Sequence, residues 1–228
     1  MLAAAAVAVA WVPETVQHRQ KRSIRFAGFG FPSARRTEFF AAGMAGFAAF
    51  SLLGIFSALA PTFLGGVLHQ HSHAVAGVIV FMIFGISAAT QIVAGRFDDR
   101  KVVCFGLALF LFVLALIVAG LSQASFGLFL AGTASAGIAV GCVFIGSLST
   151  ANRLAPAERR AQVVSSYFVL CYLGLVVPVI GVGIFSERFG LFRSVLVCSI
   201  ALAVLSVVSF AFFQSGSTTE KMKASPEG

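Results

Sequence analysis

The sequence predicts an all-α membrane protein with six membrane-spanning helices, and three observations support this fold class. Of the 228 residues, 59% are hydrophobic and 11% are charged, whereas soluble domains contain about 45–50% apolar and about 25% charged residues. The hydrophobic residues form six continuous stretches, each close to the roughly 20 residues that a helix needs to cross a bilayer. The basic residues lie mainly in the connections that flank these stretches.

The predicted spans are separated by short polar connections, and they cover residues 39–64, 74–95, 103–122, 125–150, 164–185 and 193–213. Each span must be helical, because lipid offers no hydrogen-bond partner to an unpaired backbone. A transmembrane barrel would instead show segments of about ten residues with alternating hydrophobicity. The stretches in this chain are continuous and too long for that pattern.

The basic residues predict the orientation of the spans. Of the 16 Lys and Arg residues, only Arg188, between the fifth and sixth spans, and Arg193, at the start of the sixth, lie on one side; the others precede the first span or follow the second, fourth and sixth. Lys and Arg are enriched on the cytoplasmic side of membrane proteins. We therefore expect a multi-pass protein of the plasma (inner) membrane with both ends of the six-span unit in the cytoplasm. This placement accounts for the net charge of +8, so no nucleic-acid partner is expected.

The segments outside the spans have compositions of their own. Residues 1–12 are apolar, but at about 1.5 Å per residue they are too short to cross a membrane. We expect them to be the end of a preceding transmembrane helix, which would make the chain a piece of a longer protein; a signal peptide is the alternative. Residues 13–38 are predicted to be a basic cytoplasmic linker, and residues 214–228 a disordered cytoplasmic tail.

The interior of the spans is uncharged, since no Asp, Glu, Lys or Arg lies in the middle of any of them. Charge inside a membrane is costly and usually functional, so the sequence shows no carboxylate for a proton relay. The third and sixth spans are almost wholly apolar, which predicts lipid-facing positions. The other four carry glycines and polar residues, which suit helix packing or the lining of a cavity.

Four polar side chains in the spans are candidates for contact with a small solute: Ser57, Gln91, Thr133 and Tyr172. A hydroxyl or amide inside a helix bundle either bonds a neighbouring helix or meets a solute, and the sequence leaves both possibilities open for them. Gly137 and Gly141 form a GxxxG pair, which allows two helices to approach closely.

The connection after the second span reads Gly95-Arg-Phe-Asp-Asp-Arg-Lys. Glycine permits a tight exit from a helix, an Asp can face the positive N-terminus of a neighbouring helix, and an Arg can bridge to carboxylates. A Gly followed four residues later by Asp-Arg resembles the cytoplasmic signature of the major facilitator superfamily, although its later basic part is reduced to Lys101. The signature latches the cytoplasmic side in that family, so the resemblance implies that Gly95, Asp99 and Arg100 form a cytoplasmic gate.

Three further stretches resemble the same family. Residues 11–15 resemble the end of its sixth helix, residues 154–160 the loop before its eleventh helix, and residues 172–178 that helix itself. The resemblance implies that the six spans are helices seven to twelve, half of the family's fold, arranged as two inverted three-helix repeats. It also implies secondary active or facilitative transport of a small solute by alternating access, with or without a coupled proton or ion, together with a missing N-terminal half.

A function of another class stays open: a six-span membrane scaffold or regulatory subunit that transports nothing. Packing glycines without a polar cavity would suit such a protein. Upstream coding sequence for further spans would favour the transporter. We expect no enzyme, because the chain contains neither a GxxxxGK[ST] loop nor an HExxH motif.

Metal or cofactor binding is not expected either. His69, His71 and His73 are close together, and imidazoles at this spacing could hold a transition metal. They lie in a short connection without acidic residues, so we interpret them as polar loop residues. The four cysteines lie inside apolar stretches and form no CxxC pair, which argues against a zinc site or a disulfide framework.

Overall fold

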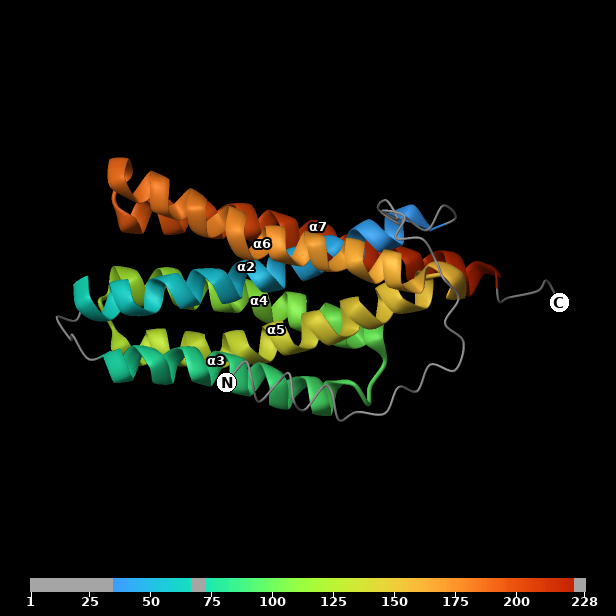
Figure 1. Ribbon diagram of the computed structural model, residues 1–228, viewed down its shortest axis with the longest axis horizontal. Helices are drawn as coiled ribbons and strands as arrows, with labels where there is room; N and C mark the ends of the chain where they lie inside the picture. The colour runs from blue at the N-terminus through green and yellow to red at the C-terminus, as the bar shows by residue number, and fades with distance from the viewer. Residues whose placement is uncertain (1–34, 67–72, 224–228) are drawn as a thin grey trace, which may run out of the picture.

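The computed structural model describes residues 35–66 and 73–223. These residues form six α-helices and one short 3₁₀ turn: α2 (Arg36–Gly66), α3 (His73–Ala94), α4 (Asp99–Ser122), α5 (Phe126–Leu154), η1 (Ala157–Arg159), α6 (Arg160–Phe189) and α7 (Leu191–Lys223). The helices run alongside one another in an elongated bundle (Figure 1). The predicted histidine cluster lies outside the described residues, except that His73 begins α3. Residues 1–34 also lie outside them.

All six helices are long and apolar enough to cross a membrane, which confirms the predicted all-α membrane fold. Each helix contains nearly all of the apolar stretch predicted for it, and most extend into the flanking polar residues; α6, for example, covers Arg160–Phe189 where residues 164–185 were expected. Polar residues can continue a helix beyond the hydrocarbon, because the backbone hydrogen bonds are independent of the side chains. Figure 1 places the start of α2, the α3–α4 connection, the α5–α6 connection and the end of α7 at one end of the bundle. We call this the basic end.

The connections are held by local hydrogen bonds. Asp98 precedes α4 and accepts a hydrogen bond from the backbone nitrogen of Lys101 at 3.0 Å, while Ser125 caps α5 by accepting from Leu128 at 3.4 Å. Such caps satisfy backbone donors that the first turn of a helix leaves free. At the opposite end, α6 and α7 meet at Gly190, whose φ of 81° is tolerated by glycine at little cost.

The helices are packed at glycines. A Cβ added to Gly137 would lie 2.7 Å from the Cβ of Ile86, and one added to Gly141 would lie 2.7 Å from the carbonyl oxygen of Ser87. Both distances are shorter than a van der Waals contact allows, so α5 and α3 approach each other only because these side chains are absent. The predicted GxxxG contact is thereby confirmed. Elsewhere α2 packs mainly on α6 and α5, and α4 packs on α5 and α7.

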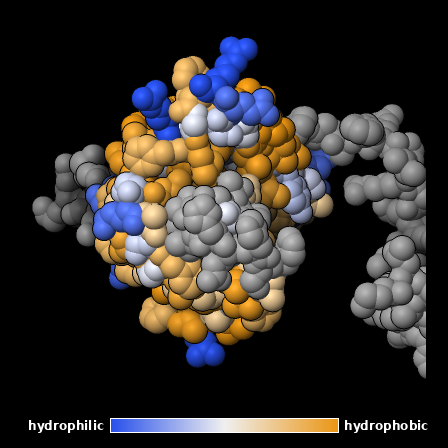
Figure 2. Space-filling view, turned by 90° about the vertical axis from the view of Figure 1, so that its left-hand side faces the viewer, coloured by the Kyte–Doolittle hydropathy of each residue, from blue (hydrophilic) through white to orange (hydrophobic). Residues whose placement is uncertain are grey.

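The prediction that the third span faces lipid is wrong for this structure, whereas for the sixth span, α7, which has 28% of its most apolar stretch buried, lipid contact stays a prediction. In the most apolar 18-residue stretch of α4, the third span, 44% is buried, whereas the buried share of the corresponding stretch is only 17% in α3 and in α6. The cause is that α4 inserts Val103, Leu107 and Phe110 into the main apolar core. Hydropathy cannot distinguish a neighbouring helix from lipid, because both are apolar. Figure 2 shows hydrophobic residues around most of the bundle when it is viewed from the end opposite the basic end.

The end of the chain also differs from the prediction. The tail was expected to be disordered from Gln214, but α7 continues to Lys223. A helix that is already formed gains one hydrogen bond for each residue it adds, so the polar composition of this segment does not end it.

Candidate functional site

The connection between α3 and α4 is a short turn held to the end of α3. The backbone nitrogen of Gly95 donates to the carbonyl oxygen of Gln91, and that of Phe97 donates to Ala94, both at 3.0 Å. A Cβ on Gly95 would lie 3.1 Å from the same oxygen of Gln91. The turn therefore favours glycine, and it sets where α4 begins.

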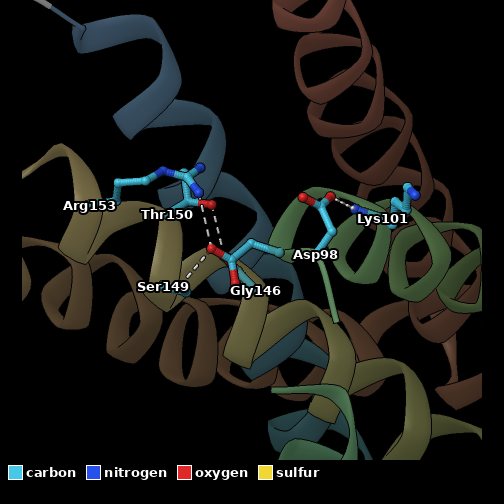
Figure 3. A network of polar contacts seen from close by, with 7 residues as sticks. Asp98, Lys101, Gly146, Ser149, Thr150 and Arg153 are labelled. Atoms are coloured by element: carbon cyan, nitrogen blue, oxygen red, sulfur yellow. Dashed lines mark hydrogen bonds and ion pairs between the residues drawn. The ribbon is translucent and has the colours of Figure 1, made fainter. Parts of the chain in front are cut away.

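Asp99, the first residue of α4, joins this helix to the last turns of α5, where Figure 3 labels its partners Ser149 and Arg153. Its carboxylate accepts a hydrogen bond from the hydroxyl of Ser149 at 2.7 Å and one from the guanidinium of Arg153 at 3.2 Å. Ser149 and Arg153 are four residues apart, so they share one face of α5. The side chain of Asp99 is 26% exposed and that of Arg153 is 61% exposed, which leaves the ion pair largely in contact with solvent.

Gly146 allows this link to form. A Cβ at this position would lie 2.7 Å from the backbone carbonyl oxygen of Asp99, so the start of α4 can rest on α5 only where the side chain is missing. Thr150, one turn later, donates its hydroxyl to the carbonyl oxygen of Gly146 at 2.8 Å. Asp98 faces another way and binds the backbone of Lys101, as Figure 3 shows.

Arg100 connects α4 to a different helix. Its guanidinium donates to the carbonyl oxygens of Phe213 and Gln214 in α7, the second at 2.7 Å. The expectation that this Arg bridges to carboxylates is therefore wrong for the conformation described. Asp99 and Arg100 together tie the start of α4 to α5 and to α7 at the basic end. Sequence reasoning identified both residues but neither of their partners, because the partners lie far away along the chain.

The four residues predicted to contact a solute occupy different environments. Gln91 donates its side-chain amide to the hydroxyl of Ser87 at 3.3 Å, and Ser57 is half-buried on α2. Thr133 is 0% exposed and donates to the carbonyl oxygen of Phe129 at 2.8 Å, so it offers no surface to a solute in this conformation. In the described part of the chain, no hydrogen bond or ring contact joins any two of the four.

Tyr172 belongs to a closed circuit of four aromatic rings, which we call the aromatic quartet: Phe50 of α2, Phe144 of α5, and Phe168 and Tyr172 of α6. Neighbouring ring centroids are 5.5 to 6.3 Å apart, within the usual range of aromatic pairs. Tyr172 is 58% exposed, and the other three rings are half-buried. Sequence reasoning missed the quartet, although the four-residue spacing of Phe168 and Tyr172 signals a shared helix face.

A buried hydroxyl pair lies behind the quartet. Tyr167 is 0% exposed, its ring centroid is 5.7 Å from that of Phe168, and its hydroxyl is 2.8 Å from that of Ser147 on α5. This pair satisfies two polar groups between α5 and α6. We interpret Tyr167 as a packing residue and Tyr172 as the ring available to a ligand.

The described residues contain no cluster of three or more His, Cys, Asp or Glu side chains that could hold a metal ion. The polar groups of the site are instead an acidic–basic link at the basic end and uncharged hydroxyls, amides and rings within the spans. Such an arrangement can bind and release a neutral or aromatic molecule and can hold two helices together reversibly.

Residues 1–179 match the family model of the Major Facilitator Superfamily. No curated protein matches the chain in a sequence search. The family match covers more than half of the chain and includes α2 to α5, the Asp99 link and the aromatic quartet. Together with six apolar helices, it shows that this chain is a membrane protein of the Major Facilitator Superfamily, a family of transporters of small solutes.

Proposed function

We propose that the chain forms one six-helix half of a secondary transporter and that it moves a small solute, alone or with a proton or ion, by alternating access. In this proposal the protein lies in the plasma membrane, and its basic end faces the cytoplasm. The link between Asp99 and the residues Ser149 and Arg153 acts as its gate, together with Gly95 and Arg100.

The observation that carries the proposal is that this link connects the two sets of three helices within the six-helix bundle. Asp99 belongs to the first three helices, α2 to α4, and its partners to the second three, α5 to α7. Exposed ion pairs stabilise by about 1 kcal/mol or less, and hydrogen bonds to charged groups by about 1.5–3 kcal/mol. A link of this size is strong enough to favour one conformation and weak enough to be broken during a transport cycle.

The packing supports two repeats of three helices. The middle helix of each set packs on the first helix of the other: α3 packs on α5, and α6 packs on α2. This exchange is what two three-helix repeats related by a two-fold axis would produce. The exposed surface of α6 and the face of α3 that carries Val78, Phe81 and Ile92 would then meet a second six-helix half, since transporters of this type rock two such halves about a central site.

The solute site in this proposal includes the aromatic quartet through Tyr172, with Ser57 and Gln91 as further polar contacts. Thr133 is buried here, so it would reach a solute only after α5 moves against its neighbours. The solute would be recognised by ring contacts and uncharged hydrogen bonds, because no charged side chain lies in the middle of the spans.

The test is transport of a panel of radiolabelled small solutes by cells that express the complete gene product, with Asp99→Asn as the variant. The exchange removes the charge, and we expect a changed transport rate for any solute that the parent protein carries. Asn can still accept from Ser149, so the main loss is that of the ion pair, about 1 kcal/mol, which shifts the balance of states by roughly fivefold. Asp98→Asn is the matched control, because Asn also caps helices well and, among the described residues, no hydrogen bond or ion pair joins Asp98 to α5. Equal transport by the parent and Asp99→Asn would remove the gate assignment.

A further inference from the structure

A groove lies between α3 and α4 near the basic end, apart from the aromatic quartet. Its volume is about 730 Å³, and α5 forms part of its wall. The walls are apolar and include Ile86, Ala89 and Val93 from α3, Phe105 from α4 and Ile138 from α5. Val93 and Phe105 are each 59% exposed, so the groove opens on the outer surface of the described bundle.

The length of the groove corresponds to one leaflet of a bilayer. Its lining residues on α3 run from Ile86 to Ala94, which is about 12 Å of helix at 1.5 Å per residue. Half of a hydrocarbon core roughly 30 Å thick is about 15 Å. The groove ends at Asp98 and Lys101, the residues at the boundary between the apolar span and the polar connection. A chain lying in the groove would therefore have its polar end beside Lys101.

The charged lining residues at the mouth of the groove are Asp98 and Lys101, and the exposed Arg96 adjoins the lining residue Phe97, so basic residues outnumber acidic ones there by one. Among the described residues, Asp99 is paired with Arg153, and Asp98 accepts from the backbone nitrogen of Lys101. The side chains of Lys101 and Arg96 are exposed and form no ion pair with any described residue. Basic residues at this depth attract the anionic headgroups of a membrane surface.

We propose that this groove is a binding site for an anionic phospholipid: one acyl chain lies along Ile86, Val93 and Phe105, and Lys101 and Arg96 bind the headgroup phosphate. This site is separate from the proposed solute site and does not depend on it. Apolar walls fit the chain, the positive mouth fits the phosphate, and the depth places both groups where a bilayer lipid has them. A zwitterionic lipid such as phosphatidylcholine also carries a phosphate, but its choline offsets that charge, so the excess of basic residues would attract it less than an anionic lipid.

The test places one tryptophan in the groove and measures its quenching by brominated acyl chains. The purified full chain carries Trp11→Phe, which removes its only tryptophan, together with Phe105→Trp. It is reconstituted in phosphatidylcholine vesicles that contain brominated phosphatidylglycerol or brominated phosphatidylcholine. The matched control is Phe212→Trp, which lies on α7 near the basic end, is 44% exposed and does not line the groove.

We expect quenching of the tryptophan at residue 105 to show that the groove binds brominated phosphatidylglycerol about fivefold or more tightly than brominated phosphatidylcholine. Adding Lys101→Gln and Arg96→Gln should abolish this preference while leaving quenching by phosphatidylcholine unchanged, which would show that the protein is still folded in the bilayer. The tryptophan at residue 212 should show little preference. Three results would overturn the site: equal preference at residues 105 and 212, a preference that survives the double Gln variant, or no quenching at residue 105 by either lipid. The last would mean that protein covers the groove.

Discussion

At the scale of single residues, the order Asp98-Asp99-Arg100-Lys101 gives four adjacent charges four different environments. Asp98 caps its own helix, Asp99 binds α5, Arg100 binds α7, and Lys101 stands at the mouth of a groove. Successive residues of an α-helix point in directions about 100° apart, so neighbouring side chains contact different helices. The motif is therefore a junction between three helices.

The hydroxyl of Ser149 is expected to matter more for this junction than the charge of Arg153. Ser149 donates to Asp99 at 2.7 Å, whereas the Arg153 pair is longer, at 3.2 Å, and is 61% exposed on the Arg side. Ser149→Ala should lower the stability of the purified protein in detergent by about 1–2 kcal/mol. Arg153→Gln should change it by less than about 1 kcal/mol. Thermal unfolding followed by a thiol-reactive fluorophore would measure both changes.

A control for this prediction is Ser165→Ala on α6, which makes the same chemical change at an exposed position. The Ser165 side chain forms no hydrogen bond among the described residues, so the Ser165→Ala variant should unfold at the temperature of the parent protein. If Ser149→Ala and Ser165→Ala unfold at the same temperature, the bond from Ser149 to Asp99 does not stabilise the bundle.

At the scale of helices, α6 shows why a glycine can be essential at one turn and replaceable at another. A Cβ on Gly174 would collide with the backbone of Phe47 in α2, whereas a Cβ on Gly181, two turns later on the same helix, would have no atom within 4 Å. The two glycines are seven residues apart, with Pro178 between them, so helical spacing alone puts them on the same face. Only the structure distinguishes the packed glycine from the free one.

Gly174→Ala should therefore destabilise the bundle, since the clash is with backbone atoms that cannot rotate away; overpacking of this kind costs about 1–3 kcal/mol. Gly181→Ala should be neutral or stabilising by up to about 1 kcal/mol, because alanine favours the helix more than glycine does. The unfolding midpoints of both variants in increasing concentrations of a denaturing detergent would measure the difference in stability. Equal unfolding midpoints would contradict the close contact between α6 and α2.

At the scale of the whole molecule, the orientation that we propose from the basic residues can be tested directly. The four cysteines all lie within helices, and Cys142 and Cys171 are buried. In a variant with these cysteines replaced by alanine or serine, we expect a membrane-impermeant maleimide added to intact cells to label Gln123→Cys in the α4–α5 turn. The same reagent should leave Ala157→Cys, in η1 at the basic end, unlabelled until the cells are opened. Labelling of Ala157→Cys in intact cells would reverse the proposed orientation and place the gate outside.

The sequence by itself determined the helices of this protein. Long apolar stretches can satisfy their backbone in lipid only as helices, so number, position and approximate ends of the six described helices followed from composition along the chain. The same reasoning located Gly95, Asp99 and Arg100 at one end and the GxxxG pair inside the bundle.

Only the tertiary structure decided what these helices touch. It placed Ser149 and Arg153 against Asp99 and arranged the aromatic quartet from three helices. It also buried Thr133, for which the sequence left solute contact open, and packed one face of α4 into the core, where the sequence predicted lipid contact. The physical reason is that hydropathy reports only preference for an apolar environment, and a helix neighbour and a lipid chain are equally apolar. Which side chain meets which depends on contacts between residues far apart in the chain.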